Sequence, residues 1–138
     1  MKLKFYQDPG HGWVKVQRKF LKKLEIADKI SSCSLMRGDD IFLEEDCDLT
    51  LFCDTMEKQG ITFSFEESHT NKSSKIRSYD SYINYTPEEE QEIKSLRTKM
   101  LAYSNWNKQS IYKIKRASLE SLKFWQGHYK NFTKKIQP

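Results

Sequence analysis

The chain has 138 residues, of which 37% are hydrophobic and 13% aromatic, and its formal net charge is +5. This length and aromatic content exclude a disordered chain and are typical of one domain, or of a small domain with an appendage. The three cysteines, an odd number without a C-x-x-C pair, argue against a disulfide framework or a structural zinc site.

The same composition predicts a cytoplasmic location. No run of 18 apolar residues is present, which argues against a membrane-spanning helix. The first residues lack the apolar stretch of a signal peptide. We therefore expect a protein of a reducing compartment with no membrane partner.

The first 26 residues predict two strands followed by a helix. The strands are expected at residues 3–6 and 13–16, on either side of a turn at residues 8–12 that is rich in glycine and proline. In residues 17–26 the apolar positions change to the spacing of one helical face, with lysine and arginine around it.

The same plan then recurs. Residues 33–43 predict a second hairpin of two strands. Asp46 or Asp48 is expected to cap the helix that follows, because a carboxylate accepts the free N–H groups of a first turn. Gly60 is expected to end that helix, and residues 61–65 alternate between apolar and polar as a fifth strand does.

These elements predict an α+β fold in the order ββα-ββα-β. The expected result is a mostly antiparallel sheet with two helices packed on one face, and the recurring plan indicates a weak internal duplication. Residues 67–82 are rich in serine, lysine and tyrosine, which predicts a linker or an extended arm. The first domain is therefore expected to span residues 1–82 and the second residues 83–138.

The second domain is predicted to be an antiparallel helical hairpin. Thr86, Pro87 and Glu89 have the spacing of a capping box with proline at the first helical position. After a break at residues 104–107, a long second helix is expected from about residue 108 to residue 136. Two helices bury their apolar stripes poorly alone, so the hairpin is expected to dock on the sheet domain or to form a homodimer.

Positive charge is concentrated in this second domain. Residues 1–82 carry thirteen basic and fourteen acidic residues, whereas residues 83–138 carry eleven and five. On one continuous helix, a single face would hold Lys113, Arg116, Lys123, Lys130 and Lys134. With Lys72, Lys75 and Arg77 of the linker, this face is predicted to contact nucleic-acid phosphates without reading sequence.

The basic face is also compatible with two roles that involve no nucleic acid. The first is a solvated surface helix, whose charges face water and bind no polyanion. Anionic lipid also attracts basic amphipathic helices, although the apolar stripe fits packing within the protein better.

The sequence offers little support for an enzyme. His11 and His69, with carboxylates such as Asp39 or Glu44, could bind a metal ion or move protons. Nothing in their spacing places them together, and no hydrolase or nucleotide-binding motif is present. We therefore expect no catalytic residue, no metal site and no cofactor, and we keep a metal-assisted hydrolase only as a third hypothesis.

An acidic segment at the predicted strand–helix junction has two interpretations. Helix capping explains one of its aspartates. The remaining carboxylates could contact a basic protein partner, and the candidates for such a surface are Glu44, Glu45, Asp46 and Asp48.

Residues 5–82 resemble a family of small phage and plasmid proteins that has no established activity. The resemblance lies in residues 8–13 (DPGHGW), 26–31 (IADKIS), 37–39 (RGD), 43–48 (LEEDCD) and 75–79 (KIRSY). It covers a little over half of the chain and does not include the helical hairpin. The resemblance implies an accessory protein of a mobile element, acting in the cytoplasm of a bacterial host, and it carries over no functional residue.

Two functional hypotheses follow. The first is a non-enzymatic accessory protein that binds nucleic acid or a nucleoprotein through the basic C-terminal helix. The second is a protein-binding inhibitor of a host defence system, of the anti-restriction or anti-CRISPR type.

Overall fold

The chain divides into two compact units, Met1–Asn84 and Tyr85–Pro138, called unit 1 and unit 2 below. A computed structural model describes residues 1–102 and 106–133, with side chains as far as residue 127. In this described part of the chain, no helix has both the length and the apolar character that are needed to cross a bilayer.

Unit 1 is a six-stranded sheet with short helices between the strands. The sheet order is β5-β1-β2-β4-β3-β6, and only the β1–β5 pair is parallel. The predicted α+β class and the mostly antiparallel sheet are therefore confirmed. The elements are β1 (Lys2–Gln7), β2 (Gly12–Gln17), α1 (Arg18–Lys23), η1 (Ala27–Lys29), β3 (Leu35–Arg37), β4 (Asp40–Glu44), α2 (Leu49–Lys58), β5 (Ser64–His69), η2 (Lys75–Ser78) and β6 (Asp80–Ser81).

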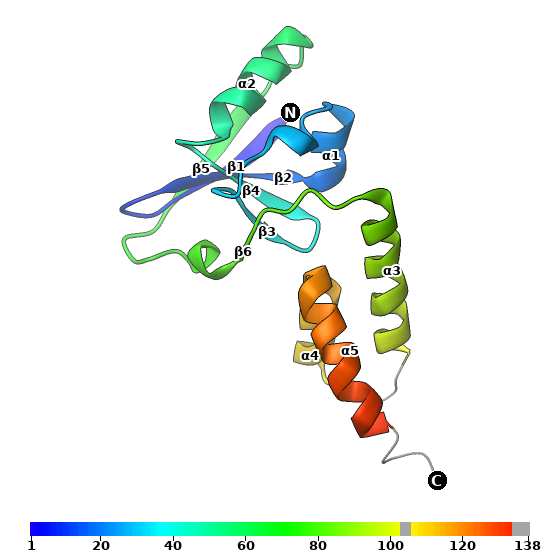
Figure 1. The fold of residues 1–138 in the computed structure, drawn as a ribbon. Helices are drawn as coiled ribbons and strands as arrows, with labels where there is room; N and C mark the ends of the chain where they lie inside the picture. The colour runs from blue at the N-terminus through cyan, green and yellow to red at the C-terminus, as the bar shows by residue number, and fades with distance from the viewer. Residues whose placement is uncertain (103–105, 134–138) are drawn as a thin grey trace. The chain divides into compact units, whose positions relative to one another are not determined.

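One face of the sheet is covered by α1 and α2, as predicted (Figure 1). Val14 of β2 and Leu43 of β4 are paired and fully buried. Phe52 of α2 is also fully buried, and its ring contacts Phe20 of α1 and Phe63. The two helices therefore share one apolar core with the central strands.

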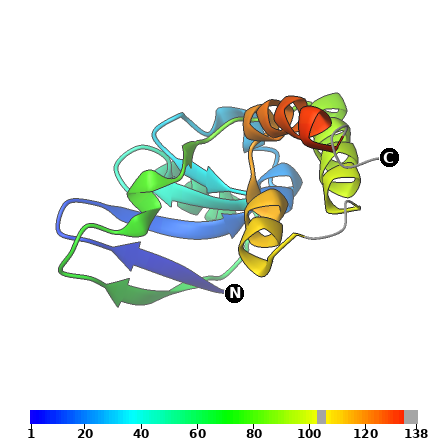
Figure 2. The same ribbon diagram turned by 90° about the horizontal axis from the view of Figure 1, so that it is seen from below.

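The opposite face is covered by the segment between β5 and β6, which lies within residues 67–82, the stretch that the sequence predicts to be a linker. Ile76 in η2 is buried against Trp13 and Phe42, and Tyr79 packs at the edge of this cluster. Figure 2 shows the segment, in green, crossing the sheet face turned toward the viewer. Residues 67–82 are thus part of the fold of unit 1, because Ile76 and Tyr79 bring apolar surface to a mostly polar stretch.

The fifth strand lies later in the chain than predicted. Gly60 has a φ of +68°, and the backbone N–H groups of Gly60 and Ile61 donate to the carbonyls of Glu57 and Met56. These two bonds form a Schellman motif, which confirms Gly60 as the end of α2. Because Ile61 belongs to this helix end, strand pairing with β1 starts only at Ser64.

The described residues of unit 2 form three helices that pack together: α3 (Pro87–Leu101), α4 (Lys108–Arg116) and α5 (Leu119–Thr133). The predicted capping box at the start of α3 is confirmed, since Thr86 and Glu89 exchange side-chain to backbone hydrogen bonds. Buried side chains inside the unit include Met100, Ile114 and Leu122.

The prediction of one long helix after residue 108 is wrong. Ala117 has an extended backbone with ψ of 148°, and this residue separates α4 from α5. Ser118 then caps α5, because its Oγ accepts a hydrogen bond from the N–H of Ser121 at 3.2 Å. The predicted two-helix hairpin is therefore a three-helix unit.

Two side chains satisfy backbone groups that the break leaves without helical partners. Arg97 of α3 donates from Nη2 to the carbonyl oxygen of Ala117 at 3.1 Å. The N–H of Leu119 donates to Tyr85 Oη at 3.3 Å. Ala117 and Leu119 are both buried, so their backbone groups cannot bond to water and need these partners. The two bonds therefore stabilise the break between α4 and α5.

We predict that Ser118→Ala destabilises the protein by about 1 kcal/mol, because it removes the N-cap of α5. Urea unfolding followed by circular dichroism measures the change. Ser110→Ala is the matched control: Ser110 lies inside α4, where alanine is the better helix former. Equal stability of the Ser118→Ala variant and the native chain would contradict the assigned cap.

Candidate functional site

The α4 helix carries a cluster of positive charge within unit 2. Its nine residues include Lys108, Lys113, Lys115 and Arg116 and no acidic residue. The three lysines are exposed, whereas Ile114 is 2% exposed and faces the interior of unit 2. We call these four basic residues, together with Tyr112, the α4 basic face.

Tyr112 and Arg116 form a stacked pair on this face. The Cζ atom of Arg116 lies 3.8 Å from the centroid of the Tyr112 ring, and Tyr112 is 44% exposed. Arg116 Nη1 also donates to the Tyr112 carbonyl oxygen at 3.4 Å. These contacts restrict the guanidinium, so it presents a flat, charged group at the surface of the helix.

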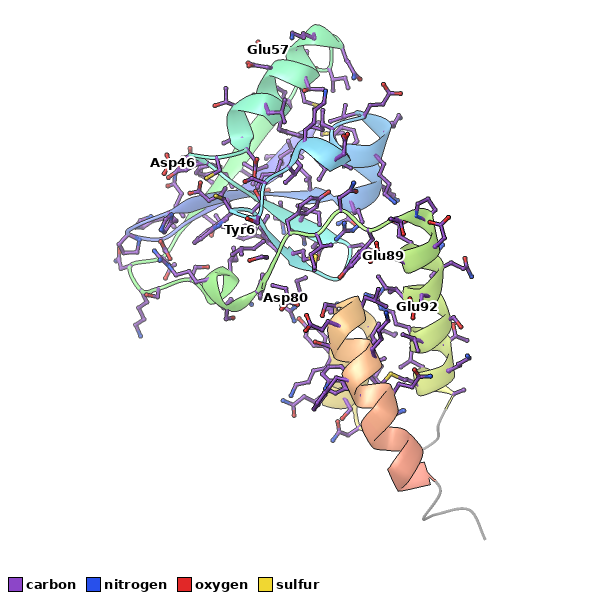
Figure 3. The ribbon with its side chains drawn as sticks, in the orientation of Figure 1. Tyr6, Asp46, Glu57, Asp80, Glu89 and Glu92 are labelled. Atoms are coloured by element: carbon purple, nitrogen blue, oxygen red, sulfur yellow. The ribbon has the colours of Figure 1, made fainter. Side chains whose placement is uncertain are left out.

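Where the structure describes them, the basic residues predicted on one helix face are divided between two helices. Lys113 and Arg116 lie on α4, whereas Lys123 and Lys130 lie on α5. Lys123 Nζ lies 3.5 Å from Glu92 of α3, and both side chains are about half exposed; Figure 3 labels Glu92. The side chain of Lys130 and the whole of Lys134 lie outside the described residues.

Part of the α4 basic face is not predicted from the sequence. Periodicity through one continuous helix places Lys115 on an apolar seam. The spacing of Ile111 and Ile114 within a shorter helix would instead place Lys108, Tyr112 and Lys115 on the solvent side.

The linker residues predicted to bind phosphate divide into two kinds. Lys72 and Lys75 are exposed. Arg77 instead donates from Nε and Nη2 to the two carboxylate oxygens of Asp8, at 2.5 and 2.8 Å. Arg77 therefore has a structural partner inside unit 1.

Asp8 is the centre of a hydrogen-bond network. Its side chain is wholly buried, and it also accepts the backbone N–H groups of Gly10, His11 and Ser74 at 2.9–3.0 Å. The Arg77 guanidinium, with these N–H groups, holds the pKa of Asp8 far below its ordinary value. The same pairing raises the pKa of Arg77.

Asp48 has a similar buried role at the start of α2. Its carboxylate accepts hydrogen bonds from Ser31 N, Ser31 Oγ and Ser34 Oγ at 3.0, 2.8 and 2.5 Å. Asp48 occupies the N-cap position of α2, but its side chain makes no capping bond. The predicted side-chain cap is therefore wrong, because the two serines of a distant loop bind the carboxylate.

Glu44 is a third buried carboxylate, at the end of β4. Its Oε2 accepts the backbone N–H groups of Asp46 and Cys47 at 2.8 and 3.1 Å. Its Oε1 lies 3.2 Å from Nδ1 of His11. Of the four carboxylates predicted to bind a protein, Glu44 and Asp48 are thus buried within unit 1, Glu45 is half-buried and Asp46 is exposed.

The strands bring His11 to this acidic segment. Trp13 pairs with Glu44 across β2 and β4, and Glu45 N donates to the Gly12 carbonyl at 3.0 Å. The turn before β2 therefore runs beside the segment after β4. Ligand atoms of His11, Glu44 and Asp46 all lie within 4.8 Å of one another.

Neighbouring groups in the same segment are perturbed. Burial, followed by the charges of Asp46 and Glu44, raises the pKa of Glu45. A hydrogen bond with Cys33, then burial and Glu44, raises the pKa of the Cys47 thiol to about 12. Cys47 therefore stays a thiol at neutral pH.

The two histidines singled out from the sequence have different surroundings. His69 lies at the end of β5, and its Nε2 is 3.2 Å from Asn71 Oδ1. The group of potential metal ligands found among the described residues contains His11 but neither His69 nor Asp39.

Comparison with protein-family models, with curated proteins and with solved structures returns no match to this chain. The resemblance to phage and plasmid proteins therefore stays a prediction from the sequence.

We predict that Asp8 makes the stability of unit 1 sensitive to acid. Because Arg77 lowers the pKa of Asp8 in the folded state, this carboxylate stabilises the fold above about pH 4, where an unfolded aspartate is also ionised. Below that pH the unfolded chain takes up the proton first, and the stabilisation is progressively lost.

The Asp8→Asn variant should therefore be less stable than the native chain at neutral pH and should lose less stability on acidification. Urea unfolding at about pH 6 and about pH 3 measures both effects. Asp54→Asn, at an exposed site of α2, is the control and should keep the native pH dependence. An equal pH dependence for Asp8→Asn and the native chain would contradict the role given to this ion pair.

Proposed function

We propose that the protein is a non-enzymatic nucleic-acid binding protein that contacts phosphates through the α4 basic face. The observation that carries this proposal is the presence of four cations and no acidic residue in the nine residues of α4. Among the described residues, Lys108, Lys113 and Lys115 form no ion pair within 4.0 Å. These three charges are available to an external polyanion.

The distribution of charge within unit 2 supports the same partner. Three of the acidic residues, Glu88, Glu89 and Glu90, lie in the first turn of α3. Their negative charges interact favourably with the positive end of the helix dipole. After Glu92 the rest of the chain has eleven basic residues and one acidic residue, Glu120. A phosphate approaching α4 therefore meets little repulsion from the chain beyond α3.

The kind of contact follows from the side chains. Lysines on flexible stems neutralise phosphates as point charges, and phosphate contacts carry no sequence information, so binding without sequence specificity is expected. The stacked Tyr112 and Arg116 add a planar group on which an unpaired base can stack. This pair favours single-stranded RNA or DNA over a regular duplex.

The proposal predicts that Lys108→Gln, Lys113→Gln and Lys115→Gln together weaken nucleic-acid binding and its dependence on salt. Each phosphate contact contributes about 0.7 to the slope of log K against log salt on a single strand, and about 0.9 on a duplex. The triple variant should therefore lose about 2 from the slope on single strands. Fluorescence anisotropy with a labelled oligonucleotide, titrated at several salt concentrations, measures it.

A matched control separates the α4 basic face from overall charge. Lys19, Lys23 and Lys29 are exposed lysines of unit 1, and changing all three to Gln removes the same charge. Glutamine keeps good helix propensity, so circular dichroism should not change in either variant. Equal weakening by the two triple variants, or binding by the native chain that does not fall as salt rises, refutes the proposal.

The alternative of a protein-binding inhibitor of host defence has less support. It relies on four acidic residues, of which Glu44 and Asp48 are buried and engaged inside unit 1. A pull-down from nuclease-treated lysate distinguishes the two: a stoichiometric protein partner retained after the treatment supports inhibition, and its loss supports nucleic acid. An origin in a mobile element is compatible with either function and rests on the sequence resemblance alone.

A further inference from the structure

The group formed by His11, Glu44 and Asp46 combines one nitrogen and two oxygen donors at a single point of unit 1. It lies apart in sequence from the α4 basic face, and nucleic-acid binding does not use it. His11 comes from the turn before β2, and the carboxylates come from the end of β4 and the segment leading to α2, where Figure 3 labels Asp46. The spacing of the donors decides whether they can share one metal ion.

The spacing of the first two donors is within about 0.1 Å of that of ligands on one zinc ion. Zinc holds imidazole nitrogen and carboxylate oxygen at about 2.0–2.2 Å, which places two tetrahedral ligands about 3.3–3.6 Å apart. His11 Nδ1 and Glu44 Oε1 are 3.2 Å apart. The Asp46 carboxylate lies within 4.8 Å of both, and its side chain is exposed, so binding one ion requires this carboxylate to turn toward the other two donors.

The surroundings also hold the first two donors in place. The backbone N–H groups of Asp46 and Cys47 occupy Glu44 Oε2, which leaves Oε1 directed at His11. The backbone N–H of His11 is bonded to Asp8, and its ring lies 5.8 Å from that of Trp13. Hydrogen bonds of this kind orient the ligands of metal sites before the ion arrives.

A simple ion pair between His11 and Glu44 would account for the 3.2 Å distance, but Asp46 would then have no role in it. A metal site requires all three donors, so the ion pair and the metal site differ in what they predict for Asp46.

We propose that His11, Glu44 and Asp46 bind one divalent transition-metal ion, with zinc as the best fit. An imidazole ligand favours zinc and its neighbours over calcium and magnesium, which take oxygen ligands. Three protein ligands leave a fourth position to water, which is the arrangement of an open zinc site. This site keeps His11 and Glu44 of the ligands considered from the sequence, and it has Asp46 in place of His69 and Asp39.

The test is a titration of the full chain with zinc alone, in competition with a chromogenic chelator and under a thiol-free reductant. The expected result is one zinc ion bound per chain. His11→Gln and Asp46→Asn should each weaken binding by about tenfold or more, since each removes one of three ligands. Both positions are exposed, so circular dichroism should show a native fold in both variants.

Two controls make the outcome decisive. His69→Gln removes a histidine outside the group and should leave zinc affinity unchanged. Cys33→Ser with Cys47→Ser removes the neighbouring thiols, and cobalt in place of zinc should show no thiolate charge-transfer band in the native chain. Absence of stoichiometric binding, an unchanged affinity in Asp46→Asn, or a cobalt–thiolate band lost with the cysteines would each overturn the proposal.

Discussion

The buried carboxylate of Asp8 is the interaction on which the arrangement of unit 1 depends. It closes the turn between β1 and β2 through Gly10 and His11, and it holds the segment of Ser74 and Arg77 across the sheet. An ionised carboxylate without solvent contact is tolerated only when its oxygens are fully bonded. The same group therefore fixes the position of His11 and the cover over Trp13.

The fold was predictable where short-range chemistry determines it. The capping box at Thr86, the end of α2 at Gly60 and the two strand–turn–strand–helix stretches all follow from neighbouring residues, and the structure contains them. The break at Ala117 had a local signal too, a serine able to cap the next helix. The backbone groups buried at this break are bonded by Arg97 and Tyr85, which lie far away in the chain. Helical periodicity does not include such distant partners, and it therefore predicted one long helix.

The buried charges were not predictable for a related reason. Asp8, Glu44 and Asp48 look like residues of turns and caps, and each also has a partner contributed by a distant segment. The position of Arg77 on a polar stretch likewise predicted a cation available to phosphate, but its guanidinium is paired with Asp8. For the proposed metal site, the sequence grouped His11 and Glu44 among its possible ligands, and the pairing of β2 with β4 brings Asp46 to them.

The parallel pairing of β1 with β5 has a consequence for the order of folding. Lys2 pairs with Ser64 and Gln7 with His69, so one edge of the first strand remains open until nearly all of unit 1 has been synthesised. Closing such a long loop is entropically costly and slow. The hairpin of β1 and β2 can form early on the ribosome, but the sheet is completed only when β5 and the segment bearing Arg77 have emerged, which makes this stage of translation the one most exposed to aggregation.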